Sequence, residues 1–183
     1  MAGIDEKRTF HPLNIAILTV SDSRTMETDK SGATLQARAE AAGHAVVSRV
    51  ILPDDYERLV DQLNAWIDDA SIEVIITTGG TGVTGRDVTP EAVEAVGEKH
   101  IPGFGELFRW LSYKLISTST IQSRATAVVS RGTYIFALPG STGACKDAWD
   151  GILKDQLDIR HRPCNFAELI PRLQEHAGCG HHH

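Results

Sequence analysis

Two aspartates and a glycine-rich loop are the residues of this sequence best suited to chemistry. Asp87 closes the run "TTGGTGVTGRD", and Asp54 lies in "LPDD". A carboxylate beside an anion-binding loop repels phosphate unless a cation lies between them, and Mg²⁺ is the usual cation. The pair therefore indicates nucleotide or phosphate chemistry with Mg²⁺.

Both aspartates also have simpler interpretations. Asp87 could pair with the adjacent Arg86 or hydrogen-bond between the loop and the next helix. Asp54 stands three residues before Glu57, which is the spacing of a helix N-terminal capping box. Local sequence alone predicts Asp54 as a helix cap.

The glycine loop contains the letters of a dinucleotide fingerprint, because Gly80, Gly82 and Gly85 spell G-x-G-x-x-G after an apolar strand. Residues 86–88 nevertheless separate the last glycine from the helix start predicted at Thr89, so the turn is too long for that motif. A Walker loop needs a lysine, and none occurs between Lys30 and Lys99. The remaining interpretations are a loop whose N–H groups approach an anion, flanked by threonine hydroxyls, and a plain chain-reversing turn.

Three other polar segments could line a binding site. "SDSRT" (21–25) follows the first predicted strand, and "LPGST" (138–142) places Ser141 where it could cap a helix or contact an anion. "STSTIQSR" (117–124) carries five hydroxyls and Arg124, either in a polar pocket or in an exposed loop. No spacing suggests a covalent nucleophile.

Hydrophobic periodicity predicts the elements that must position these residues. Strands are expected at 14–21, 45–52 and 73–78, and a hairpin through Gly132 is expected from 125–132 and 133–140. Helices are expected at 33–44, 53–70, from Pro90, at 104–116, at 141–157 and, as a short tail, at 165–176. The predicted apolar stripe of the 104–116 helix is Phe104, Leu107, Phe108, Leu111 and Leu115.

This order of elements predicts a three-layer α/β domain, a mostly parallel sheet with helices on both faces and an antiparallel edge. Ligands of such sheets bind beyond the carboxyl ends of the strands, where the polar segments fall. If the second and third strands are parallel neighbours, Asp54 and Asp87 emerge at one edge and can share a cation.

Composition excludes several classes of protein. The chain has 183 residues, 42% of them hydrophobic, which is ordinary for one globular domain, predicted at 1–178. A net charge of −6 without a basic block argues against nucleic acid as a partner. The N-terminus lacks the apolar segment of a signal peptide and no stretch has membrane length, so we expect a cytoplasmic protein. Cys145, Cys164 and Cys179 form neither a disulfide framework nor a zinc motif, and residues 179–183, "CGHHH", are interpreted as a tail or tag remnant.

Seven motifs together resemble one family. They are "ILTVSDSR", "LPDD", "ITTGGTGVTGRDVTPEA", "IPGFGELFR", "STIQSRA", "FALPGST" and "RPCNF", spread over residues 17–166. The chain resembles the MoaB/Mog family of molybdenum cofactor biosynthesis proteins, and the segments 105–125 and 144–166 are closer to the MoaB branch.

The resemblance implies a trimer or a dimer of trimers that binds molybdopterin, a pterin with a dithiolene and a terminal phosphate. It further implies that Mg-ATP adenylylates this phosphate, with release of pyrophosphate, before a MoeA-type partner inserts molybdate. The essential aspartates of the family match Asp54 and Asp87, which would act in catalysis and hold Mg²⁺, so the resemblance outweighs the capping interpretation of Asp54. The residues then expected to bind nucleotide or molybdopterin are Ser21, Asp22, Thr78, Gly79, Gly80, Thr81, Gly82, Glu106, Ser123, Pro139, Gly140 and Ser141.

Overall fold

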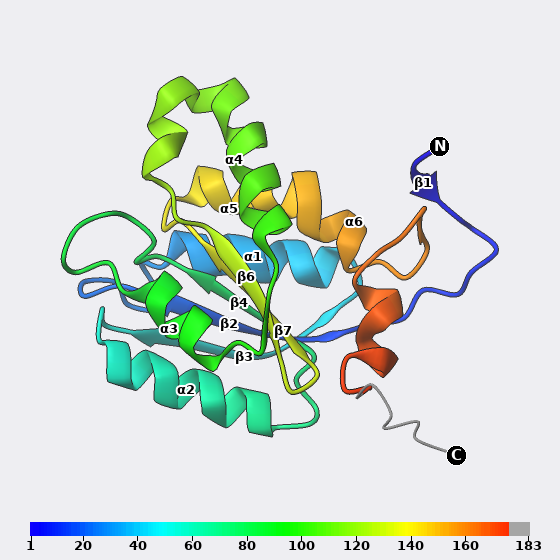
Figure 1. Ribbon diagram of the computed structural model, residues 1–183, viewed down its shortest axis with the longest axis horizontal. Coiled ribbons are helices and arrows are strands. Elements are labelled where there is room, and N and C mark those ends of the chain that lie inside the picture. The colour runs from blue at the N-terminus through cyan, green and yellow to red at the C-terminus, as the bar shows by residue number, and fades with distance from the viewer. Residues whose placement is uncertain (176–183) are drawn as a thin grey trace, which may run out of the picture.

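A six-stranded sheet forms the centre of the computed structural model, which describes residues 1–175 (Figure 1). The strand order is β3-β2-β4-β7-β6-β5. The strands are β2 (Asn14–Val20), β3 (Ala45–Leu52), β4 (Val74–Thr78), β5 (Lys99–His100), β6 (Thr126–Ser130) and β7 (Thr133–Leu138). β3, β2, β4 and β7 are parallel, whereas β6 and β5 are antiparallel to their neighbours, so the predicted mixed sheet with an antiparallel edge is confirmed.

Helices cover both faces of this sheet, as predicted (Figure 1). On one face lie α1 (Lys30–Ala41), α4 (Pro102–Ile116) and α5 (Thr142–Ala148), the last continued by η2 (Trp149–Leu153) and α6 (Lys154–Gln156). On the other lie α2 (Tyr56–Asp68) and α3 (Thr89–Val96). Short elements complete the described chain: a two-stranded sheet of β1 (Gly3–Ile4) and β8 (His161–Arg162), and the 3₁₀ helices η1 (Ser117–Gln122) and η3 (Ala167–Arg172).

The alternation of side chains along the strands builds a core on each face of the sheet. In β2, Ile15 and Ile17 pack with α1, α4 and α5, whereas Ala16 and Leu18 pack with α2 and α3. Successive strand residues point to opposite faces, so a continuous apolar run serves a sheet that is covered on both sides. This burial fixes where the strands end, and therefore where the polar segments emerge.

Two sequence predictions about helices are only partly right. Phe104 and Phe108 of α4 are buried, but Leu107 and Leu115 are 42% and 65% exposed, because α4 and η1 extend away from the sheet (Figure 1). The tail helix is a 3₁₀ turn with Pro171 inside it, since proline removes an N–H donor and disfavours the α conformation of the residue before it. His176, the end of the predicted domain at 178 and the tail 179–183 lie outside the described residues.

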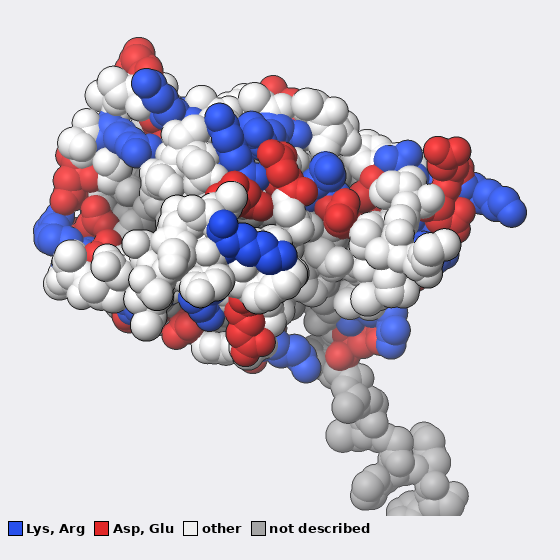
Figure 2. Space-filling view, turned by 90° about the horizontal axis from the view of Figure 1, so that it is seen from above, with Lys and Arg blue, Asp and Glu red and all other residues white. Residues whose placement is uncertain are grey.

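Charges of both signs are mixed on the face of the molecule seen in Figure 2, where Lys and Arg side chains are interspersed with Asp and Glu. No helix within residues 1–175 combines the length and the apolar character needed to cross a membrane.

A buried ion pair anchors the start of α1. Asp29 caps the helix by accepting from the backbone N–H of Gly32 (2.9 Å), and it also accepts from Thr19 Oγ1 (2.8 Å) and Arg49 Nη2 (2.9 Å). The Asp29 side chain is 0% exposed. Burial raises the pKa of Asp29, but the hydrogen bonds and the Arg49 charge outweigh it, so the pKa lies below its ordinary value. The ionised form therefore stabilises the folded state.

Asp29→Asn should lower the free energy of unfolding at pH 7 by about 3 kcal/mol, because it leaves the partly buried Arg49 guanidinium without its charge partner. A depressed carboxyl pKa contributes stability above the unfolded-state value of about 4, and this contribution is lost as the pH falls through the folded-state value. The difference between wild type and variant in urea unfolding should therefore shrink below about pH 4. The control is Asp150→Asn, which breaks the more exposed pair with Arg38 (3.0 Å) and should change stability little. Equal losses in the two variants would contradict the assignment.

Candidate functional site

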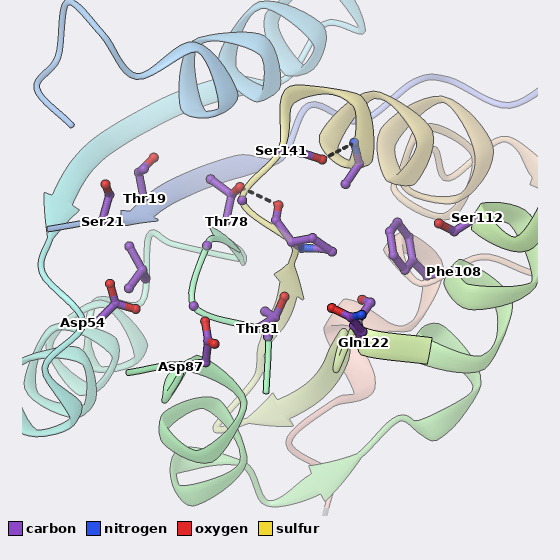
Figure 3. Close-up of a pocket in the computed structure, with 18 of the residues that line it drawn as sticks. Thr19, Ser21, Asp54, Thr78, Thr81, Asp87, Phe108, Ser112, Gln122 and Ser141 are labelled. Atoms are coloured by element: carbon purple, nitrogen blue, oxygen red, sulfur yellow. Dashed lines mark hydrogen bonds between the residues drawn. The ribbon is translucent and has the colours of Figure 1, made fainter. Parts of the chain in front are cut away.

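One pocket of about 480 Å³ lies beyond the carboxyl ends of the parallel strands (Figure 3). Its walls come from the segments after β2, β3, β4 and β7, and from α4 and η1. Of the residues expected to form the site, the lining contains Ser21, Asp22, Asp54, Thr78, Gly79, Gly80, Thr81, Gly82, Asp87, Ser123, Pro139, Gly140 and Ser141. The structure thus gathers segments that are far apart in the sequence.

Glu106 is the exception. It lines a neighbouring hollow of about 530 Å³ together with Glu94, His100 and Arg109. Ser123 lines both hollows, so Glu106 lies next to the main pocket without contributing to its wall.

Asp54 and Asp87 line one pocket although the strands before them are not neighbours, so the assumed pairing of these strands is wrong. β3 and β4, the strands that precede them, are not neighbours, because β2 lies between them. All three strands are parallel, so their carboxyl ends still share one edge. Figure 3 shows Asp54 and Asp87 on the same side of the pocket, and the strands that precede them, β3 and β4, lie on either side of β2 in the sheet.

The glycine loop passes so close to β2 that side chains do not fit. Gly79 (φ +102°) and Gly80 (φ +67°) have left-handed backbone conformations that favour glycine. A Cβ on Gly79 would lie 2.2 Å from the carbonyl oxygen of Val20. The backbone N–H of Gly79 donates to the carbonyl of Leu138 (3.0 Å). This N–H is therefore engaged within the protein, and the loop offers a ligand one backbone donor fewer than its sequence predicted.

Asp54 does not cap a helix, which corrects the local interpretation of the sequence. Asp55 is the cap of α2 and accepts from the N–H of Arg58 (3.1 Å). Asp54 instead lies against the glycine loop, with Oδ1 2.9 Å from the position of a Cβ on Gly80. Burial raises the pKa of Asp54, and the negative charge of Asp22 raises it further. A cation at this point would relieve both effects.

Asp87 is held by its own loop. Its Oδ2 accepts from the backbone N–H (2.9 Å) and the hydroxyl (2.7 Å) of Thr84. Burial raises the pKa of Asp87, but these bonds, the backbone of Gly82 and the charge of Arg124 outweigh it, so Asp87 is ionised. Arg86, which the sequence offered as an ion-pair partner of Asp87, pairs with Asp22 instead.

Arg124 fastens the glycine loop to the rest of the protein. Its Nε donates to the carbonyl of Gly82 (2.7 Å), and its Nη2 donates to the carbonyl of Asp87 (3.0 Å). Its backbone N–H donates to the carbonyl of Thr81 (3.0 Å). It also pairs with Glu91 of α3. Arg124 therefore positions the loop that carries Asp87, a role that its place in "STIQSRA" did not reveal.

The opposite side of the pocket is built around Ser141. Its hydroxyl caps α5 by accepting from the N–H of Ala144 (3.1 Å), and Thr78 Oγ1 donates to the Pro139 carbonyl (2.9 Å) (Figure 3). The 117–123 segment lines the pocket through Ser119, Thr120, Gln122 and Ser123, so it is not simply an exposed loop. Lining residues that were not predicted as site residues include Thr19, Arg24, Ser112 and Gln122, and Phe108 was predicted only as part of the apolar stripe of its helix. Arg24 carried a usable signal, since it lies in the "SDSRT" segment at a strand end.

The donor set fits a metal ion that is shared with a ligand. Within residues 1–175 no three His, Cys, Asp or Glu side chains form a group that could hold an ion by themselves. Two carboxylates beside a glycine loop fit Mg²⁺, which commonly takes one or two protein carboxylates and completes its shell with phosphate oxygens and water. Asp54 and Asp87 are the residues that would hold it.

The fold and the pocket together define a class: an α/β protein that presents glycine backbone and carboxylates at the carboxyl edge of its sheet. Comparison with known families narrows this class. The family described as "Probable molybdopterin binding domain" matches residues 16–159. The chain therefore belongs to the MoaB/Mog family of molybdenum cofactor biosynthesis proteins.

Several proteins similar to this chain are described as MoaB proteins, in agreement with the branch that the motifs predicted. The chain is 49% identical over 157 residues to "Molybdenum cofactor biosynthesis protein B" of Escherichia coli (strain K12), which covers 86% of this chain and 92% of that protein. A crystal structure with the same description has a TM-score of 0.82 at 38% identity and covers 91% and 98% of the two chains. The "tungsten cofactor synthesizing protein MoaB" of Pyrococcus furiosus has a TM-score of 0.70 at 34% identity and covers 79% and 92%.

Proposed function

We propose that this protein binds molybdopterin and adenylylates its terminal phosphate with Mg-ATP, releasing pyrophosphate. The observation that carries the proposal is that Asp54 and Asp87 line one pocket together with the glycine loop. Membership of the molybdopterin-binding family supports the pterin as the acceptor.

The proposed reaction is a nucleotidyl transfer. An oxygen of the pterin phosphate forms a bond to the α-phosphorus of ATP. The bond from this phosphorus to the oxygen that bridges the α- and β-phosphorus atoms breaks, and pyrophosphate leaves with the bonding electrons. Mg²⁺ would neutralise charge on the triphosphate and on the leaving pyrophosphate. Asp54 and Asp87 would hold this ion, and the glycine loop would let the phosphates approach the backbone, so that alignment and charge neutralisation supply most of the rate.

The alternative proposal is a molybdopterin-binding protein without adenylyl transfer. The pocket supports adenylyl transfer over binding alone, because both acidic residues are present and each keeps a carboxylate oxygen that could contact a cation. Asp55 caps α2 and leaves Asp54 to the pocket, and Asp87 keeps one oxygen, Oδ1, outside its bonds with Thr84.

A pyrophosphate assay tests this function. The protein is mixed with molybdopterin, ATP and Mg²⁺, and pyrophosphate is followed by a coupled enzyme reaction. We expect release that depends on the pterin and on Mg²⁺. Binding of the pterin without pyrophosphate release would support the alternative, and NADH titration serves as a control that should give no binding signal.

We propose further that the protein works in the cytoplasm as a trimer or a dimer of trimers, and passes its product to a MoeA-type partner. Exposed apolar side chains support self-association. They are concentrated on α4 and η1, at Leu107, Trp110, Tyr113, Leu115, Ile116 and Ile121. Exposed apolar side chains that gather on one segment often mark a protein interface.

A further inference from the structure

Arg24 is the one Lys or Arg among the described residues that line the main pocket, and it shares that pocket with the carboxylates of Asp22, Asp54 and Asp87. A pterin phosphate carries close to two negative charges at neutral pH. Three carboxylates oppose the entry of such a group, so its position depends on where the positive charge lies. The Arg24 side chain is 32% exposed and can therefore be reached from the pocket.

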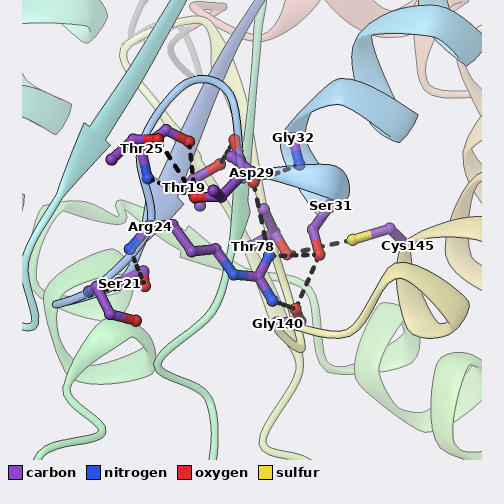
Figure 4. Close-up of polar contacts among 12 residues, drawn as sticks. Thr19, Ser21, Arg24, Thr25, Asp29, Ser31, Gly32, Thr78, Gly140 and Cys145 are labelled. Atoms are coloured by element: carbon purple, nitrogen blue, oxygen red, sulfur yellow. Dashed lines mark hydrogen bonds and ion pairs between the residues drawn. The ribbon is translucent and has the colours of Figure 1, made fainter.

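Two hydrogen bonds and a buried carboxylate hold the Arg24 guanidinium in place (Figure 4). Its Nη1 donates to Ser31 Oγ (2.8 Å) and its Nη2 donates to the carbonyl of Gly140 (3.1 Å). Asp29 Oδ1 lies 3.6 Å from Nη1, and the Asp29 side chain is 0% exposed. A guanidinium has five N–H donors, so these contacts orient Arg24 and leave donors for a ligand.

The position of Arg24 gives the pocket two chemically different ends. Arg24 contacts Gly140, the residue before Ser141, and Figure 3 shows Ser141 on the other side of Thr78 from Asp54 and Asp87. The acidic pair suits a metal-bound polyphosphate. The end with Arg24 and the Ser141 hydroxyl suits an anion without a metal, because charge-assisted hydrogen bonds from arginine to phosphate are strong and geometrically specific.

We propose that Arg24 binds the phosphate monoester of the pterin substrate, at the end of the pocket opposite the Asp54 and Asp87 pair. This proposal rests on the pterin-binding half of the proposed function and does not require adenylyl transfer. Asp29, Ser31 and Gly140 orient the guanidinium, and the phosphate that Arg24 holds is the one that would attack ATP.

The test compares four proteins: wild type, Arg24→Gln, Arg24→Lys and the control Arg38→Gln. Arg38 is a matched control because its side chain is also partly exposed (29%) and paired with an aspartate, Asp150, but it does not line the pocket. Each protein is titrated calorimetrically with molybdopterin, with molybdopterin from which a phosphatase has removed the phosphate, and with Mg-ATP.

Arg24→Gln should weaken binding of molybdopterin by about 10-fold or more, because it removes charge-assisted bonds to the phosphate. It should leave the affinity for the dephosphorylated pterin and for Mg-ATP within about twofold, and Arg24→Lys should fall between wild type and Arg24→Gln. Arg38→Gln should match wild type with all three ligands.

An equal loss with the phosphorylated and the dephosphorylated pterin would overturn the proposal, because it would mean that Arg24 only shapes the turn at Gly140. Unchanged affinity in Arg24→Gln, or a wild type that binds neither pterin, would overturn it as well. A selective loss of phosphate binding in a protein that releases no pyrophosphate would support the role of Arg24 and refute only the adenylyl transfer.

Discussion

Asp87→Asn should lower turnover in the pyrophosphate assay by about 100-fold or more while the protein still binds molybdopterin. The substitution removes a negative charge that would hold Mg²⁺, but the amide oxygen can still accept the hydrogen bonds of Thr84 that fix the loop. The loss should therefore appear in turnover and in the Mg²⁺ concentration needed for half-maximal rate. Steady-state kinetics and pterin titration measure the two effects separately.

Asp55→Asn is the matched control for this prediction. It removes one carboxylate next to Asp54, and asparagine caps a helix about as well as aspartate. We expect its turnover to equal that of wild type. Full turnover in Asp87→Asn would assign Asp87 a structural role, and an equal loss in both variants would point to a general effect of charge.

Gly79→Ala should destabilise the protein by about 3 kcal/mol and abolish binding of Mg-ATP. The new Cβ would lie 2.2 Å from the backbone oxygen of Val20 in the central strand β2, and φ is +102°. Neither the strand nor the loop can yield easily, because the N–H of Gly79 bonds to Leu138 and its carbonyl accepts from Thr89 (2.8 Å). Urea unfolding and ATP titration measure the two losses.

Gly85→Ala provides the comparison within the same loop. A Cβ on Gly85 meets no atom within 4 Å, so its effect on stability should stay within about 0.5 kcal/mol. Similar stability in the two variants would show that the close approach of Gly79 to Val20 is not needed.

The helices and strands could be predicted because buried residues follow a pattern along the sequence: apolar runs in the strands and a helical spacing in the helices. The apolar runs of β2 and β4 gave the strands, and the late helix start at Thr89 separated this loop from a dinucleotide fingerprint. The order of the strands did not follow, since apolar runs carry no signal of which strand is the neighbour of which. The exposed Leu107 and Leu115 were mispredicted, because helical spacing cannot show where a helix leaves the sheet.

Parts of the site could be predicted and parts could not, for a related reason. Residues at strand ends, such as Ser21 and Ser141, were predicted because the edge of a parallel sheet gathers them. Asp54 was first interpreted as a cap, since two adjacent acids have nearly the same spacing to the helix and only backbone geometry selects Asp55. Arg124 reaches the glycine loop from a distant segment, and such a contact leaves no local pattern.

The separation of β3 and β4 by β2 has a consequence for how such proteins can diverge. Asp54 and Asp87 stand on different crossover connections, and within residues 1–175 no hydrogen bond joins their side chains. One substitution can therefore remove either carboxylate while the supports of the other, and the pocket wall around Arg24 and Ser141, stay in place. Under the proposed function, one such substitution would remove the chemistry and leave the ligand bound, so that catalysis and binding could be inherited separately.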